Sequence, residues 1–194
     1  MTSSDFIKSV LLSGHDALTA FSEGRLTSSF GEVIESEKCL EFPVLGHWYT
    51  SVLLGTQDFR VTFKIHYSFP RILPWLSENQ ARSIEQGLSH SREFGAELSN
   101  WWAGRIKSQL LVSVNDLSFG LPVHSLGFDE LFSRRSNGRD CYFGALKVLN
   151  ENDAQSFLWM SVLLELKSLD ALEKLSLPEN DDSERSTSGG FELL

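Results

Sequence analysis

SHSREFGAELSNWWAGRIKSQLL, residues 89–111, is the stretch that decides the fold. At about 100° per residue, its large apolar side chains fall on one face of a helix, which is typical of a helix that packs against a sheet. The members of this apolar stripe are Phe94, Leu98, Trp101, Trp102 and Ile106. We predict an amphipathic helix here, anchored by the aromatic area that its adjacent tryptophans bury.

The opposite face of this helix carries Glu93, Glu97, Asn100, Gly104 and Lys107. Glu97 and Asn100 are three residues apart and so are neighbours on the helix surface, with Gly104 one turn further on. Asn is a poor interior helix residue, and Gly costs about 1 kcal/mol there relative to Ala. We interpret this face as a candidate site that another surface approaches at Gly104. The alternative is an ordinary solvated helix face.

The run from Glu97 to Lys107, ELSNWWAGRIK, followed by Pro122, resembles a motif of the CheC/CheX family of chemotaxis phosphatases. That motif is a helix with Glu-Leu-x-Asn-x3-Gly-x2-Lys, and a downstream proline opens a strand segment. The motif occurs once in this chain, as in the CheX branch. The sequence departs from the family pattern at Glu93, where Asp or Ser is usual, and in a slightly shorter spacing from Asn100 to Pro122.

The resemblance implies a protein phosphatase that acts on the phosphoaspartate of a CheY-type response regulator. Asn100 would orient the attacking water, and Glu97 would dock on the regulator's active-site lysine. Glu93, Gly104 and Lys107 would complete the partner-binding surface, with Gly104 leaving room for the partner's backbone. The resemblance implies no cofactor for the chain itself, Mg²⁺ being held by the partner regulator, and it implies a homodimer.

Two other functions stay open at this point. The departures at Glu93 and in the proline spacing are compatible with a catalytically silent CheC-like binding or scaffold domain in chemotaxis or two-component signalling. A pocket beneath Trp101 and Trp102 could instead serve a small-molecule sensor, although tryptophans on an apolar stripe are more often core residues.

Composition limits the remaining classes of function. The 194 residues carry a net charge of −9 and no cluster of Lys and Arg with interleaved aromatics, which argues against nucleic-acid binding. The N-terminus lacks the form of a signal peptide, and the most apolar run, residues 157–164, is too short to span a membrane. With Cys39 and Cys141 far apart, we expect a cytoplasmic protein with free thiols.

Other catalytic chemistry finds little support in the sequence. The five histidines show no paired metal-ligand spacing, so we expect no metal site. No nucleophile elbow and no phosphate-cradling Gly-rich loop are present. A site of Glu97 and Asn100 is chemically complete only if a partner supplies the rest.

The rest of the chain predicts an α+β fold with a mainly antiparallel sheet, because hairpins replace βαβ repeats. We expect a helix capped by Ser3 or Ser4, a strand over 26–35, a hairpin over 47–54 and 59–69, and a helix over 77–88. A proline-entered strand segment within 113–140, strands over 141–149 and 155–167, and a short helix over 169–175 follow. Residues 1–176 would form one CheX-like domain, and the acidic residues 177–194 a disordered tail.

Overall fold

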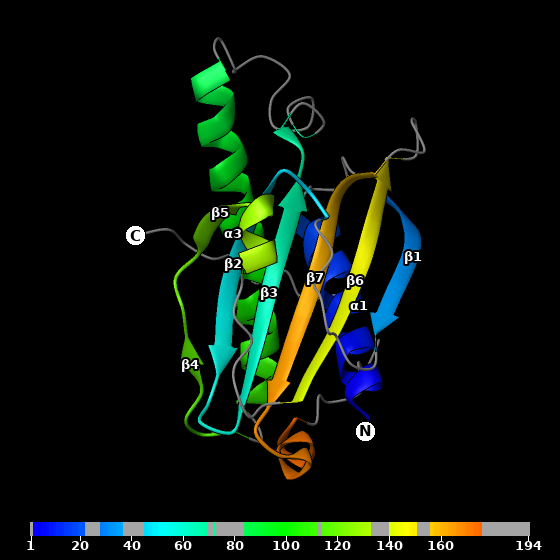
Figure 1. Ribbon diagram of the computed structural model, residues 1–194, viewed down its shortest axis with the longest axis vertical. Coiled ribbons are helices and arrows are strands. Elements are labelled where there is room, and N and C mark those ends of the chain that lie inside the picture. Colours follow the sequence, from blue (N-terminus) through cyan, green and yellow to red (C-terminus); the bar gives the residue numbers. More distant parts are fainter. Residues whose placement is uncertain are drawn as a thin grey trace.

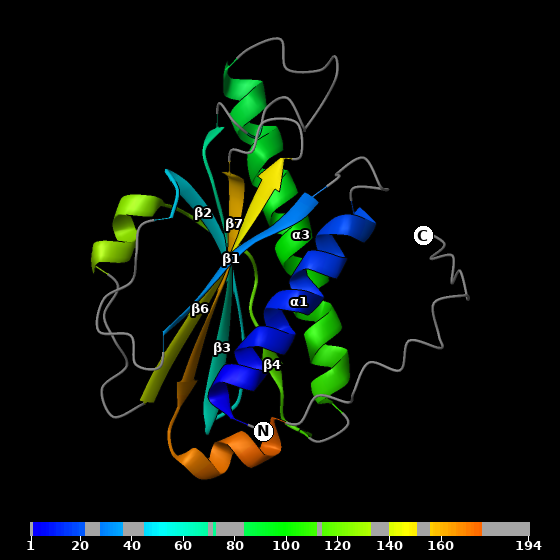
Figure 2. The same cartoon turned by 90° about the vertical axis from the view of Figure 1, so that its right-hand side faces the viewer.

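The computed structural model describes residues 2–21, 28–36, 45–69, 72, 84–111, 114–132, 140–150 and 156–175. Within them, one antiparallel sheet has the strand order β1–β6–β7–β3–β2–β4, and β5 also pairs with β2. Helices α1 and α3 lie side by side over one face of this sheet (Figures 1 and 2). The predicted α+β class with an antiparallel sheet is therefore confirmed.

The elements have the following bounds. The strands are β1 (Ser28–Ser36), β2 (Trp48–Gly55), β3 (Phe59–Tyr67), β4 (Ser118–Phe119), β5 (Val123–Leu126), β6 (Asp140–Asn150) and β7 (Ser156–Leu166). The helical elements are α1 (Ser3–Phe21), α3 (Ile84–Leu110) and the 3₁₀ helices η1 (Gly127–Phe132) and η2 (Leu169–Lys174).

The predicted hairpin is present as β2 and β3, paired from Trp48↔Tyr67 to Gly55↔Arg60. Alternate residues of β3 face the helices, and Val61, Phe63 and Ile65 are fully buried there. This follows from the period of two along a strand, which turns successive side chains to opposite faces.

The other face of β3 carries polar side chains, and two of them are buried. Lys64 is only 8% exposed and His66 only 2% exposed. The Lys64 ammonium lies 5.2 Å from the centre of the Tyr49 ring, and His66 Nε2 hydrogen-bonds Ser161 Oγ at 2.7 Å. Burial, assisted by the Lys64 charge, lowers the pKa of His66 to about 3. Strand alternation alone could not show that these polar residues have such contacts.

Helix α1 begins with a reciprocal cap at Thr2 rather than at Ser3 or Ser4. The Asp5 amide donates to Thr2 Oγ1 at 3.1 Å, and the Thr2 amide donates to Asp5 Oδ2 at 2.9 Å. This is the capping-box arrangement with Asp in place of Glu. The Thr2 hydroxyl also donates to Asp5, and these hydrogen bonds lower the pKa of the Asp5 carboxyl.

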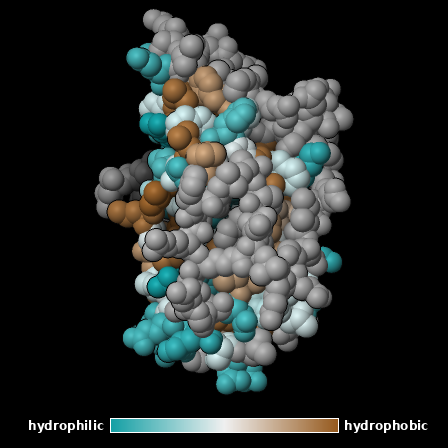
Figure 3. Space-filling view, in the orientation of Figure 1, coloured by the Kyte–Doolittle hydropathy of each residue, from teal (hydrophilic) through white to brown (hydrophobic). Residues whose placement is uncertain are grey.

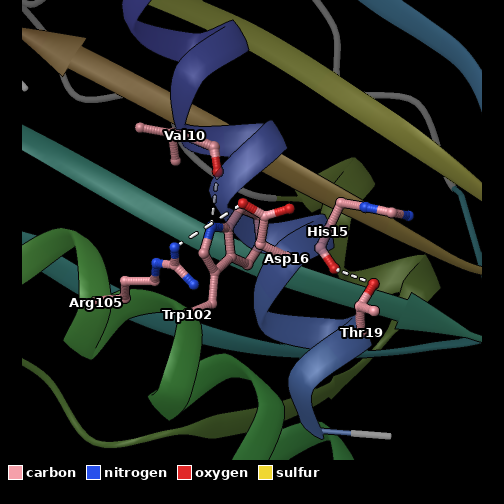
Figure 4. Close-up of polar contacts among 6 residues, drawn as sticks. All are labelled: Val10, His15, Asp16, Thr19, Trp102 and Arg105. Atoms are coloured by element: carbon pink, nitrogen blue, oxygen red, sulfur yellow. Dashed lines mark hydrogen bonds and ion pairs between the residues drawn. The ribbon is translucent and has the colours of Figure 1, made fainter. Parts of the chain in front are cut away.

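Trp102 fixes α3 against α1 and the sheet. Its indole Nε1 donates to the Val10 carbonyl at 2.9 Å (Figure 4), and its ring meets Phe63 edge-on at 5.0 Å. A Cβ at Gly14 would lie 2.6 Å from the Trp102 ring, so only glycine admits the indole at this point of α1. Arg105 and Asp16 add a surface ion pair at 3.9 Å, which contributes little by itself.

Helix α3 is one continuous helix from Ile84 to Leu110, so the predicted boundary between residues 88 and 89 is wrong. Residues 77–80, where we expected that first helix to begin, lie outside the described residues. A Cβ at Gly95 would lie 2.5 Å from Thr50 Oγ1, so glycine lets α3 approach β2 closely.

The predicted strands near the C-terminus are present as β6 and β7. Strand β7 lies between β6 and β3, which places it inside the sheet rather than at an edge. The proline-entered segment forms the short strands β4 and β5, and the expected helix over 169–175 is the 3₁₀ helix η2. The predicted tail, residues 177–194, lies outside the described residues.

Candidate functional site

The five candidate residues lie together along α3, and we refer to them as the α3 ridge: Glu93, Glu97, Asn100, Gly104 and Lys107. Glu93 and Glu97 are exposed, whereas the other three are partly exposed. The ridge points away from the sheet because Leu98, Trp102 and Ile106, on the other side of the helix, are fully buried. The two carboxylates lie toward the N-terminal half and the lysine toward the C-terminal end, so charge changes sign along the ridge.

Asn100 has an unsatisfied polar atom. Its Oδ1 is buried and has no hydrogen-bond partner in the described part of the chain. A buried acceptor without a donor costs about 1–3 kcal/mol, so such an atom calls for an explanation. Asn100 Oδ1 is therefore an acceptor that the described residues leave unsatisfied.

The two glutamates of the ridge differ in their contacts. Glu93 Oε1 accepts a hydrogen bond from Ser89 Oγ at 3.0 Å, one turn earlier on the same helix. Glu97 has no hydrogen-bond or ion-pair partner within the described residues. Of the two, Glu97 is therefore the carboxylate available to a cation on another molecule.

Lys107 connects the ridge to the strand segment that contains Pro122. Its ammonium lies 5.4 Å from the centre of the Phe119 ring in β4. Asn100 precedes Lys107 by seven residues, which is close to two helical turns, so both side chains lie on the flank of α3 that faces β4 and β5. The structure thus brings the motif helix and the downstream proline segment to one side of the molecule.

The same flank continues toward the N-terminus of α3 with an aromatic and a histidine contact. The Arg92 guanidinium lies 5.2 Å from the Trp48 ring, and His124 Nδ1 hydrogen-bonds Thr50 Oγ1 at 2.8 Å. Burial, and then the nearby Arg92 charge, lowers the pKa of His124. Through these contacts, both α3 and β5 are held against the same strand, β2.

Gly104 faces open space. A Cβ built on it would meet no atom within 4 Å. The close approach that we expected at this glycine therefore does not come from the described part of this chain, and it is Gly95 that packs tightly. The sequence contains no signal that separates these two helical glycines.

Trp101 corrects the predicted apolar stripe, because its side chain is 57% exposed whereas Trp102 is fully buried. Successive residues differ by about 100° around a helix, so the direction that buries Trp102 turns Trp101 outward. Phe94 is only partly buried at the same margin of the stripe. Trp101 is a candidate functional residue that the sequence pattern misassigned to the core.

The ridge offers two carboxylates that can bind a cation, an amide that can orient a water molecule and an ammonium that can bind an anion. Within the described residues, no group of three or more His, Cys, Asp or Glu side chains could hold a metal ion. No helix in that part of the chain combines the length and the hydropathy needed to cross a membrane.

Sequence comparisons find no relatives for this chain: no family model matches it, and no curated protein matches it significantly. Solved structures do match. The CheC-like superfamily protein from Shewanella sp. PV-4 has a TM-score of 0.58 at 15% identity, over 85% of this chain and 99% of that one. The chemotaxis protein CheX from Vibrio vulnificus has a TM-score of 0.57 at 17% identity, over 83% of this chain and 99% of that one.

A third similar structure is the CheX–CheY–BeF₃–Mg²⁺ complex from Borrelia burgdorferi, with a TM-score of 0.59 at 13% identity over 84% of this chain and 99% of the matched chain. At these identities the likeness is one of fold. The chain has the α+β fold of the CheC-like superfamily. The CheX chemotaxis proteins have a similar fold.

Proposed function

We propose that this chain is a CheX-type phosphatase that hydrolyses the phosphoaspartate of a CheY-type response regulator. The observation that carries the proposal is the pairing on an open helix ridge of Glu97, which has no described partner, with Asn100, whose Oδ1 has no hydrogen bond. The fold supports it, because the similar CheX from Borrelia burgdorferi was solved in complex with CheY, BeF₃ and Mg²⁺.

The reaction asks little chemistry of the chain itself. A water molecule attacks the phosphorus, the bond between phosphorus and the aspartate oxygen breaks, and inorganic phosphate and a free carboxylate result. Since the acyl phosphate is already activated, catalysis consists of placing the water in line and stabilising developing charge. Mg²⁺ belongs to the regulator's acidic pocket in this scheme.

Asn100 would orient the water and Glu97 would hold the regulator in register through its lysine. Because Asn100 Oδ1 makes no hydrogen bond in the described structure, a water that donates to this oxygen displaces no existing partner of that atom. Gly104 leaves the helix surface bare one turn away, so the partner's backbone can come close to the amide. Lys107 and Glu93 border this contact.

The deciding experiment measures the loss of phosphoryl label from CheY-type regulators encoded in the same genome, with and without the chain. Faster loss that depends on Asn100 supports the proposal. The alternative, a binding or scaffold domain, is favoured by Glu93 at a position where the family has Asp or Ser. That alternative is the answer if the regulator binds and the loss of label is unchanged.

The proposed function also implies a cytoplasmic location, where its substrate would lie, and a homodimer. A second copy cannot extend the sheet by pairing with β7, because β7 lies between β6 and β3. The ends of the described sheet are β1 on one side and β4 with β5 on the other. We expect light scattering at micromolar concentration to give twice the mass of one chain, and the mass of a single chain would contradict the homodimer.

A further inference from the structure

We propose that Trp101 is a specificity-determining contact residue, which packs against an apolar side chain of the response regulator beside its phosphoaspartate pocket. This inference rests on the proposed function and adds a residue that the Glu-x-x-Asn motif does not include. The interaction surface it defines is the α3 ridge with Trp101 along one flank and the apolar residues of the β4–β5 edge along the other.

The first observation is the exposure of the side chain. Trp101 is 57% exposed on the rigid helix that Trp102, with no exposed area, fixes in the core. Tryptophan is enriched among the residues that dominate protein–protein binding, because one side chain buries a large area with only two rotatable angles. Trp102 anchors the helix in the core, whereas more than half of the Trp101 side chain is exposed.

The second observation is the place of Trp101 on the helix. It lies four residues after Glu97 and three residues before Gly104, so both are its surface neighbours. Gly104 has no side chain, and a Cβ built there would meet nothing within 4 Å, so the helix surface is open about one turn after Trp101. A partner that reaches Asn100 and Glu97 therefore also meets the Trp101 ring.

The third observation is an apolar border on the opposite side of the ridge. Phe119 is 38% exposed beneath Lys107, and Leu121 is 85% exposed between β4 and β5. Figure 3 shows hydrophobic side chains at the left of the view, where Figure 1 places β5. Aromatic and aliphatic margins around a central line of polar groups are typical of a protein-binding surface.

The chemistry of the surface identifies the occupant. A helix ridge is convex and fits a concave partner, such as a pocket formed between loops. Glu97 calls for a cation and Asn100 Oδ1 for a donor, while the flanks call for apolar side chains. A response regulator with a lysine and a water in its phosphoaspartate pocket, and an apolar residue at its rim, meets these three requirements.

The test titrates the full chain with a CheY-type regulator activated by beryllofluoride and Mg²⁺ and follows tryptophan emission and binding. We expect Trp101→Ala to raise Kd and KM by about tenfold or more, while kcat changes by less than about threefold. Trp101→Phe should retain most of the affinity and lose the blue shift that binding induces. Leu12→Ala, at an exposed apolar residue of α1, should leave affinity, turnover and the blue shift unchanged.

Three results would overturn the inference. One is an unchanged Kd in Trp101→Ala, and another is a blue shift that persists in Trp101→Phe. The third is a change in oligomeric state with Trp101→Ala, seen as a different mass in solution, which would assign the residue to a contact between copies. Trp101→Gln keeps a helix-favouring side chain and must give the same Kd as Trp101→Ala if the apolar contact matters.

If Asn100→Ala lowers turnover while Trp101→Ala changes nothing, only this inference fails. If Asn100→Ala leaves turnover unchanged, the proposed function fails.

Discussion

At the scale of single residues, Asn100 combines a structural cost with a catalytic assignment. Its side chain is poor in a helix interior, and its buried Oδ1 has no hydrogen bond within the described residues. We therefore expect Asn100→Ala to raise the free energy of unfolding by up to about 1 kcal/mol, which thermal unfolding would show as a slightly higher midpoint. The same change should lower kcat about 10²–10³-fold with a smaller change in regulator affinity, because the amide acts mainly in the transition state. Turnover and binding of one preparation decide this, and a variant that keeps full turnover contradicts the assignment.

Glu97 should behave differently because its role is electrostatic docking. Glu97→Gln removes the charge that pairs with the regulator's lysine, so affinity should fall by about tenfold at low salt. Added salt should bring the wild-type affinity toward that of the variant, since exposed charge pairs are screened over a Debye length of about 8–10 Å. Glu85→Gln, an exposed glutamate in the first turn of the same helix, is the matched control and should retain the wild-type salt dependence. Equal effects of the two changes would mean that only the net charge of the helix matters.

At the scale of the element, α3 carries three glycines, and replacement of two of them, Gly95 and Gly104, should have opposite consequences. A methyl group at Gly104 enters open space, so Gly104→Ala should stabilise the fold by about 1 kcal/mol through helix propensity. A methyl group at Gly95 would lie 2.5 Å from Thr50 Oγ1, so Gly95→Ala should destabilise the fold by roughly 1–3 kcal/mol. Thermal or urea unfolding of both variants measures this pair.

The affinity of the Gly104→Ala variant for the regulator is the second quantity to measure. The more stable Gly104→Ala should bind the regulator several-fold more weakly, because the added methyl group occupies the bare surface beside Asn100. A Gly104→Ala protein that is more stable and binds equally well would show that no partner backbone approaches this point. The glycine would then have no explanation in the fold or in the proposed docking.

At the scale of the whole molecule, the elements that the sequence predicted best are those with a regular pattern of apolar residues. The hydrophobic periodicity of α3 and the alternation of β3 sufficed to predict the helix, the hairpin and the antiparallel sheet. These patterns did not predict features that depend on contacts between elements far apart in the sequence. Periodicity could not tell that Trp101 lies just beyond the contact with the sheet, or that His66 finds Ser161 on a strand far along the chain. The candidate residues lie together as predicted because helical spacing alone makes them neighbours.

His66 makes the stability of the whole fold depend on pH. It is faced by Ser161 from β7, by the Tyr49 ring of β2 at 5.7 Å, and by Lys64 of its own strand. Its pKa is about 3 in the folded chain, against 6.5 as the ordinary value, so below about pH 6.5 the unfolded chain binds a proton that the folded chain does not. Stability from this group is therefore complete above pH 6.5 and falls as the pH decreases toward 3, by about 1.4 kcal/mol per pH unit. His124, whose pKa burial also lowers, acts in the same direction.

Urea unfolding between pH 7.5 and 4.5 checks this dependence. His66→Gln removes the titrating ring and keeps a donor for Ser161, so its stability should change much less across this range than that of the wild-type chain. His47→Gln, at an exposed histidine before β2, should keep the wild-type slope because His66 is still present. If His66→Gln and the wild-type chain lose stability in parallel, the acid sensitivity of the fold originates elsewhere, and the buried imidazole is not the group that unfolding protonates.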